Sequence, residues 1–439
     1  MIASILLAWS ITQGQASQGM FKVLFPAPTG TNGLEDYVLA TDLMDDGFWP
    51  AYKNWAPPES RAESIRQQQV YQRAFDPSAP PPDPKFVELQ QRLKDMNLLQ
   101  LREEAVAAFT KPLHLITTGN DKPCLVRVDN GSKFPSVGMI TDLSLLELDS
   151  AYVDASRSRT DAMIADLTNV LLLADRTCRN TYIGSMIATI EQQRVCDACA
   201  ENLDRLSVQD AIAIETMVTD FLQATPVFID AYRAAFQSEQ EDVARSLRAL
   251  KAGSQNATKD KQLAGFNQVM SGMSDPEVDQ MIQRAQQSIG DAGRIFLSRF
   301  SGPEETWLPQ DAPGDSLFSD VTPRSPDDVE SYFVQHWSLP EVTKPRRLAQ
   351  ALRARTLMRL LRLHATIIAY RWQHEVLPKS LIDLQLPSGY DFDPLSKRQF
   401  VYKLSGDGYE LYSVGSPFTG KIELGVAGPS TSQPAEINP

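Results

Sequence analysis

The chain has 439 residues, of which 42% are hydrophobic, and its formal net charge is -13 at pH 7. This length suggests two or three domains with substantial cores, and the ordinary hydrophobic share excludes wholesale disorder. General binding to nucleic-acid phosphates needs a positive face. We therefore expect no nucleic-acid partner.

The N-terminus has features of a secretory signal peptide over residues 1–16. An apolar run, Ile2–Ile11, has the length of a signal-peptide core, and Gly14-Gln15-Ala16 offers small residues to a signal peptidase. No Lys or Arg precedes Lys22, so a cytoplasmic protein, or a start at Met20, is the alternative. No other stretch reaches the ~18 apolar residues of a membrane helix, so we expect export without a membrane span.

Residues 17–85 are expected to be an irregular segment with short helices, because prolines and glycines interrupt them. Residues 86–300 are expected to form a helical domain, since apolar side chains recur at helical spacing. Its first helix should run from Phe86 to Phe109 and end before Lys111-Pro112. A later apolar stripe consists of Ile183, Ile187 and Ile190.

Local signals mark several helix ends in this domain. Ser207 with Asp210, and Ser274 with Glu277, have the spacing of a capping box, with Asp in place of Glu in the first. Pro226 should kink or break the helical stretch that contains it, because proline removes a backbone donor.

Residues 301–344 are dense in Pro, Gly, Asp and Ser near their start, and we expect a linker with a short helix near Asp327–His336. This linker is the predicted domain boundary. Residues 345–424 should form a module that begins with a long helix from Pro345 to about His374. Residues 425–439 have the composition of a disordered tail. The predicted fold class is mainly α, with a small α+β module of one helix and an antiparallel hairpin at the C-terminus.

The long helix is rich in arginine and contains no acid. A basic amphipathic helix can bind a polyanion or lie on an anionic membrane without spanning it. Alternatively, the arginines pair with carboxylates elsewhere in this acidic chain, and we favour that interpretation. The candidate anion- or surface-binding residues are Arg346, Arg347, Arg353, Arg355, Arg359 and Arg362.

Two of the four cysteines form a C-x-x-C motif at Cys196 and Cys199. Redox catalysis by such a motif needs a helix that opens just after a strand, whereas this one follows a helical pattern. No second C-x-x-C completes a zinc site. The pair is therefore expected to be a structural disulfide or two buried thiols.

The remaining side chains form no recognisable catalytic or metal-binding motif. No histidine pair has i, i+4 spacing, and His364, among leucines, is expected to be a core residue. No phosphate-binding glycine loop or nucleophile elbow is present. We expect no cofactor or metal, although catalytic groups can also be assembled in space from distant residues.

The C-terminal module resembles a known family in the order of its segments. A helix ends at Ala369-Tyr370-Arg371, and Pro378-Lys379-Ser380-Leu381-Ile382-Asp383-Leu384, Asp393-Pro394 and Tyr409-Glu410-Leu411-Tyr412-Ser413-Val414-Gly415 follow. This order is similar to the soluble part of the major type II secretion pseudopilin. The helix here is internal and arginine-rich, and the segment Ser416–Lys421 lacks the acids of the family's calcium loop.

The resemblance implies that Phe400–Leu404 pairs with Tyr409–Ser413 and packs on the helix face of Ile367, Ile368 and Trp372. The alternation of apolar and polar residues in both segments agrees with this pairing. The glycines of Ser405–Gly408 suit a short hairpin loop.

Three functions remain open from the sequence. The first is a non-enzymatic exported or envelope-associated scaffold with protein partners in the cell envelope, similar in layout to exported bacterial proteins with no assigned activity. The second is a hydrolase-type enzyme with a site between helices. The third is a binder of an anionic surface through the arginine-rich helix.

Overall fold

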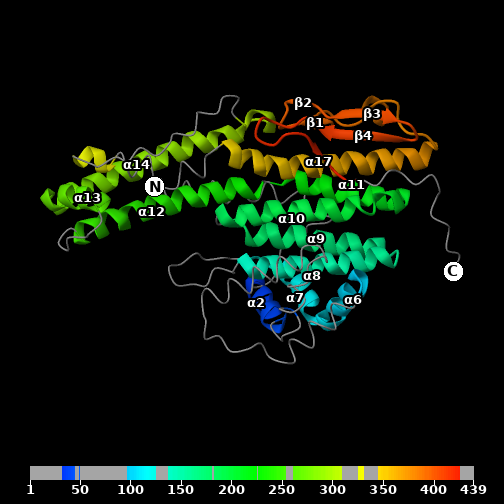
Figure 1. Cartoon of the computed structure of the whole chain (residues 1–439), viewed down its shortest axis with the longest axis horizontal. Coiled ribbons are helices and arrows are strands. Elements are labelled where there is room, and N and C mark those ends of the chain that lie inside the picture. The colour runs from blue at the N-terminus through cyan, green and yellow to red at the C-terminus, as the bar shows by residue number, and fades with distance from the viewer. Residues whose placement is uncertain are drawn as a thin grey trace. The chain divides into compact units, whose positions relative to one another are not determined.

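The computed structural model describes residues 32–44, 49, 96–124, 137–179, 182–224, 226–253, 261–308, 325–330 and 345–425. These residues are mainly α-helical, with a small antiparallel β-structure at the C-terminus, as predicted (Figure 1). The chain divides into two compact units, residues 1–177 and 178–439. The expected signal peptide, most of residues 17–85 and the tail from 426 lie outside the described residues.

The division differs from the boundary expected at 301–344. The helices before and after that segment belong to one unit, because the long helix of the C-terminal module packs against earlier helices of the same unit. A Pro- and Gly-rich segment indicates an exposed connection, but contacts between distant helices decide which elements share a core.

Unit 1 contains a bundle of helices around an apolar core. The helices are α2 (Gly33–Met44), α6 (Leu98–Ala108), α7 (Thr110–Asn120), α8 (Val137–Ser156) and α9 (Thr160–Thr177). α8 packs along α9, and α2 packs on α7. The Tyr37 hydroxyl donates to the Asn120 side chain at 2.8 Å, and a Cβ on Gly119 would lie 2.5 Å from the Tyr37 ring. Gly119 therefore permits this close approach of α2 and α7.

The helix predicted for Phe86–Phe109 is not continuous, since residues 96 and 97 are not helical, and residues 86–95 lie outside the described part of the chain. α6 begins after Asn97, whose side chain accepts from the backbone N–H of Gln100 in a reciprocal capping box. Its predicted end before Lys111-Pro112 is confirmed, because α6 ends at Ala108, and Pro112 belongs to the next helix. It lies in the first turn of α7, where a missing N–H is tolerated because that donor has no helical partner.

Unit 2 begins with three helices and a break that the sequence predicts. They are α10 (Tyr182–Ala200), α11 (Val208–Gln223) and α12 (Val227–Gly253). α11 ends and α12 begins on either side of Pro226, so the predicted break is confirmed. The capping boxes at Ser207 and Ser274 are both confirmed.

One stretch of the described residues, Val208–Ala252, is long and apolar enough to cross a membrane by length and composition. Its most apolar window is 47% buried inside the protein. A core helix passes the same test, so the stretch is weak evidence for a membrane segment.

The apolar face predicted for α10 is only partly correct. Ile187 is buried, whereas Ile183 and Ile190 are 58% and 50% exposed. The buried face instead continues along the helix through Val195, Cys196 and Cys199. The three isoleucines cover only the first half of the helix, which runs to Ala200, so they did not predict which face of the whole helix is buried.

The rest of unit 2 extends from α13 to the C-terminal strands. Its helical elements are α13 (Lys261–Gly272), α14 (Asp275–Ser298), η2 (Arg299–Ser301), η3 (Glu304–Thr306), α17 (Pro345–His374) and η4 (Leu381–Leu384), with η1 (Leu203–Arg205) after α10. Of the short helix expected near Asp327–His336, residues 326–330 are described and helical.

α17 is the central element of this part of unit 2. It has the predicted bounds and lies between the strands on one side and α10 and α11 on the other (Figure 1). The strands are β1 (Phe392–Asp393), β2 (Arg398–Gln399), β3 (Val401–Ser405), β4 (Gly408–Ser413) and β5 (Ile422–Glu423). β1 pairs with β2, and the second sheet has the order β3-β4-β5.

The predicted hairpin is confirmed. β3 and β4 are antiparallel, with Tyr402 opposite Leu411, and Gly406 in the turn has a φ of +58°. Leu411 and Ile367 are both buried. Trp372 does not belong to the packing face as predicted, because its indole N–H donates to the Leu206 carbonyl oxygen at 3.0 Å.

Candidate functional site

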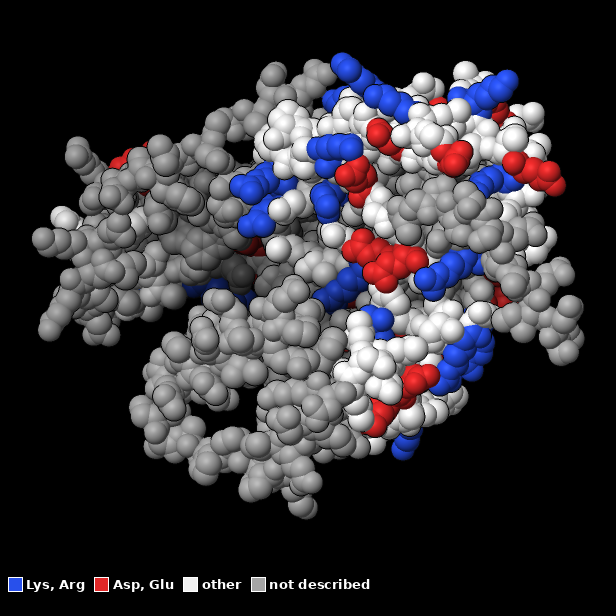
Figure 2. All heavy atoms as spheres, turned by 45° about the vertical axis from the view of Figure 1, so that its right-hand side comes forward, with Lys and Arg blue, Asp and Glu red and all other residues white. Residues whose placement is uncertain are grey.

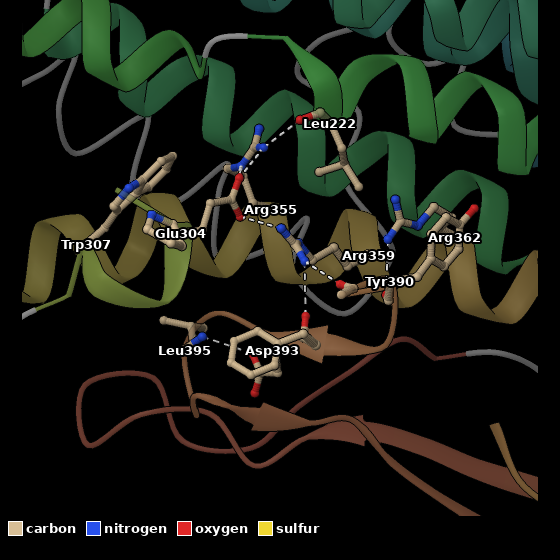
Figure 3. A network of polar contacts seen from close by, with 12 residues as sticks. Leu222, Glu304, Trp307, Arg355, Arg359, Arg362, Tyr390, Asp393 and Leu395 are labelled. Carbon is tan, nitrogen blue, oxygen red and sulfur yellow. Dashed lines mark hydrogen bonds and ion pairs between the residues drawn. The ribbon is translucent and has the colours of Figure 1, made fainter. Parts of the chain in front are cut away.

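Three of the candidate arginines on α17 contact several other segments of unit 2. Arg355, Arg359 and Arg362 follow one another at i, i+4 and i+7, so they lie along one side of the helix. They form, with Glu304 of η3, a set that we call the arginine–glutamate network (Figure 3). All four residues belong to unit 2.

Glu304 accepts hydrogen bonds from two arginines at once. The Nε of Arg355 donates to its Oε1 at 2.9 Å, and Arg359 donates to its Oε2 at 2.7 Å. Burial opposes ionisation of Glu304, but the charges and hydrogen bonds of both arginines outweigh it and lower the pKa of Glu304. The carboxyl is therefore ionised at neutral pH and neutralises part of the positive charge.

The same arginines also hold backbone oxygens of distant segments. Arg355 donates to the Leu222 carbonyl oxygen at 2.8 Å, at the end of α11. Arg359 donates to the Phe392 carbonyl oxygen at 3.1 Å, in β1. Charge-assisted hydrogen bonds are stronger than those between neutral groups, so the network fixes α11, η3 and β1 on α17.

Arg362 extends the network toward the C-terminal module. It donates to the Tyr390 carbonyl oxygen at 3.1 Å, and its guanidinium carbon lies 3.3 Å from the centre of the Tyr390 ring. Burial lowers the pKa of Arg362 to about 9, and the charge of Arg359 adds to this effect. The Tyr390 hydroxyl also contacts the Thr219 hydroxyl at 3.1 Å, which links the module to α11.

The six candidate arginines therefore occupy different environments. Arg355 and Arg359 pair with the Glu304 carboxylate, in agreement with the favoured interpretation, whereas Arg362 contacts the Tyr390 carbonyl oxygen and ring instead of a carboxylate. Arg353 donates to the Gln193 side chain at 2.6 Å. Arg346 is exposed and Arg347 is partly exposed, and both lie in the first turn of the helix.

A cleft of about 810 Å³ adjoins the network on the side of the C-terminal module. It is lined by Glu304, Arg359, Leu381, Ile382, Gln385, Leu386, Pro387, Ser388, Gly389, Asp391, Phe392 and Gln399. Its polar side chains are already partly used, since Gln399 donates to Asp391 at 2.8 Å. The apolar side chains come mainly from η4 and the loop that follows it.

His364 is a core residue, as the sequence predicts. It is buried, and its Nδ1 lies 2.9 Å from the Tyr409 hydroxyl on β4. Burial lowers the pKa of His364 to about 3, so the imidazole is neutral at physiological pH. The Tyr402 hydroxyl donates to the Pro378 carbonyl oxygen at 2.7 Å, and its ring contacts that of Tyr409. These contacts join the hairpin to α17 and to the segment after it.

The candidate disulfide residues are free thiols. Cys196 and Cys199 are both buried in α10, which corresponds to the second of the two predicted alternatives. Burial raises the pKa of the Cys199 thiol to about 12 and also raises that of Cys196. Both are therefore protonated at neutral pH, in contrast with the low thiol pKa that redox catalysis requires.

Among the described residues, no three or more histidine, cysteine or acidic side chains form a cluster that could hold a metal ion. The segment 416–421 is organised by hydroxyl groups, since the Thr419 side chain accepts from the Ser416 backbone N–H at 3.0 Å.

Sequence reasoning missed Glu304 of the network and Tyr390, which contacts Arg362. Glu304 lies in the segment that was predicted to be a linker, and no local pattern distinguishes it from other surface acids. The composition of α17 gave one indirect signal, because seven arginines without an acid on the same helix need partners from elsewhere.

No known protein-family model matches this chain, and no curated protein or solved structure is significantly similar to it.

Proposed function

We propose that the protein is a non-enzymatic, exported or envelope-associated scaffold whose C-terminal module binds a protein partner. The observation that carries the proposal is Ile382, which is 83% exposed at the rim of the cleft beside the arginine–glutamate network. Exposure of this apolar side chain to water is unfavourable, and a protein partner that covers it would remove that cost.

The position of Ile382 is fixed by local structure. It lies in η4, where the Asp383 carboxylate accepts from the Ser380 backbone N–H at 2.9 Å and completes a capping box. Val376, 60% exposed, lies in the connection between α17 and η4. Ordered apolar side chains beside a concave surface are typical of protein interfaces, where a few buried anchors supply most of the affinity.

The arrangement of the network supports a scaffold role. Its charged groups hold α11, η3 and β1 to α17, so they give the cleft a rigid base. A rigid base lowers the entropy that is lost when a partner binds. The resemblance of the module to type II secretion pseudopilins, which assemble through protein contacts, favours the same kind of partner.

The anionic-surface function has less support from the described residues. Arg355 and Arg362 are 4% and 7% exposed, so they present little surface to a membrane or polyanion. On the face drawn in Figure 2, basic and acidic side chains of the described residues are mixed instead of gathering into an extended basic patch. Electrostatic attraction to an anionic surface needs such a patch.

Site-specific photo-crosslinking in the native host tests the proposal. A crosslinker at Ile382 should capture one defined envelope protein, and that purified partner should bind the purified full-length chain. Ile382→Glu should then weaken binding by at least ~10-fold, as loss of an interface anchor does. Ile295→Glu is the matched control, because Ile295 is 68% exposed on α14, away from the cleft. Equal binding by both variants would refute the proposed surface.

The export part of the proposal has its own test. N-terminal sequencing of the protein from its native host should find the chain beginning near Ser17, as the apolar core and Gly14-Gln15-Ala16 predict. A cytoplasmic protein that retains Met1 would contradict it.

A further inference from the structure

Two sulfur-bearing side chains meet at the buried contact between α10 and α17, and a third is their neighbour on α10. The Sγ of Cys196 lies 3.2 Å from the Sδ of Met358, and Cys199 follows one turn along α10. Residues three apart lie next to each other on a helix face. All three residues are completely buried, with exposed fractions of 0%.

We propose that Cys196, Cys199 and Met358 form a soft-metal site that takes one monovalent copper ion. This inference is independent of the proposed partner surface. Thiolate and thioether sulfur atoms are the ligands that select Cu(I), and the thioether distinguishes this set from the cysteine and histidine ligands of structural zinc.

The binding step involves no change of oxidation state. Cu(I) forms bonds to the Sγ atoms of Cys196 and Cys199 and to the Sδ of Met358, and the two thiol protons leave to solvent. Two thiolates and one Cu(I) carry a net charge of -1. The guanidinium of Arg353 supplies a compensating charge, because it acts on Cys196 and donates to the Gln193 side chain on the same face of α10.

A bound ion needs room and an entry route, and two local motions supply them. Met358 has three rotatable side-chain bonds, so its sulfur can withdraw from Cys196 to admit an ion. Cys199 lies in the last turn of α10, which ends at Ala200. Helix ends open locally at low free-energy cost, so an ion can reach the site there without unfolding of the unit.

Anaerobic titration of the reduced full-length protein with Cu(I), in competition with a coloured Cu(I) chelator, tests the inference. We expect one Cu(I) per chain, with copper–sulfur bonds visible by X-ray absorption. Cys196→Ser and Cys199→Ser should each weaken binding by more than ~100-fold, because loss of even a supporting residue outside the ligand set costs ~10–100-fold. Affinity should rise by roughly 100-fold per pH unit, since two protons are released.

Two further variants separate the site from other sulfur chemistry. Met358→Leu conserves volume and removes the thioether, so it should weaken binding by ~10-fold without unfolding the protein. Cys178→Ser is the matched control, because Cys178 is also 0% exposed but lies outside the cluster. Circular dichroism checks that each variant is folded.

Several results would overturn the site. They are a stoichiometry far from one, equal Cu(I) affinity in the Cys178→Ser and Cys196→Ser variants, an unchanged affinity in Met358→Leu, or tighter binding of Zn²⁺ than of Cu(I). Isolation of the native protein with a Cys196–Cys199 disulfide would also overturn it, because the thiolates would not be available.

Discussion

In unit 2, Glu304 lies between two arginines, whereas in unit 1 two acids, Glu147 and Asp166, lie near each other on α8 and α9. Burial and the charge of Asp166 raise the pKa of Glu147 well above its usual value. Burial raises the pKa of Asp166 to about 7. Their partners are the Asn169 amide, 3.4–3.5 Å from Glu147, and the Ser150 hydroxyl, which hydrogen-bonds Asp166. Burial opposes ionisation of all three acids, and only at Glu304 do the charges and hydrogen bonds of two arginines outweigh it.

The two regions therefore differ in how they respond to pH. The network of unit 2 holds its charge at neutral pH and acts as a fixed clamp between segments. Burial raises the pKa of Glu147 and of Asp166 in unit 1, so the contribution of these two acids to the packing of α8 on α9 depends on pH.

The largest effect is expected from Glu304→Gln, which leaves two largely buried arginines without their counter-charge. Removing one partner of a buried ion pair costs ~3–5 kcal/mol. Urea denaturation of the full chain, followed by a probe in unit 2, should show this loss in the free energy of unfolding. A loss below ~1 kcal/mol would mean that water replaces the carboxylate and that the clamp is weak.

The apolar contacts beside the network give a reference for that loss. Ile367 on α17 is 0% exposed, and Ile367→Ala should cost roughly 2–5 kcal/mol, as a large-to-small change in a packed core does. The same denaturation experiment measures it. If Ile367→Ala is much more costly than Glu304→Gln, apolar packing, and not the charge network, holds the module to α17.

Unit 1 is expected to become less stable as pH rises, whereas in ordinary acid denaturation a protein becomes less stable as pH falls. The pKa of Asp166 is raised in the folded state, so its stabilising effect is complete below the unfolded pKa of ~3.9 and is lost as pH rises through about 7. Hydrogen exchange of α8 and α9 amides, corrected for the intrinsic pH dependence, should show stability falling over this range.

Asp166→Asn sharpens the test. The variant cannot titrate at this position, so the slope should decrease by up to roughly 1.4 kcal/mol per pH unit, which is the contribution of one proton. Asp161→Asn is the control, since Asp161 is an exposed acid on the same helix. An unchanged slope in Asp166→Asn would place the titration elsewhere.

The smallest effect is expected from an exposed ion pair. Arg248 and Asp279 are 66% and 59% exposed, with their atoms 3.4 Å apart. Asp279→Asn should change the free energy of unfolding by less than ~1 kcal/mol, because solvent screens such pairs. A larger loss would show that the contrast between buried and exposed pairs does not hold here.

Much of the fold followed from local patterns in the sequence. The capping boxes at Ser207 and Ser274, the break at Pro226, the bounds of α17 and the β3–β4 hairpin were all predicted. Each depends on residues within a few positions of one another, so the physical cause is contained in a short segment.

The candidate site was predicted only in part. The arginines of α17 were named from the sequence, but Glu304 and Tyr390 were not, since they lie about 50 positions before and 30 positions after those arginines. Which arginine is buried and which is exposed also depends on what packs against each turn of α17.

The sequence by itself determined where helices begin and end, because caps, prolines and glycines act through neighbouring backbone groups. Tertiary structure alone decided the unit boundary, the buried face of α10 and the partner of each charged group. These features depend on which elements, distant in the sequence, pack together and exclude water from their contact. The local sequence around a residue does not show which elements those are. The contact of Cys196 with Met358, 162 positions apart, is an example: a C-x-x-C pattern shows two thiols, and only the packing of α10 on α17 adds the third sulfur.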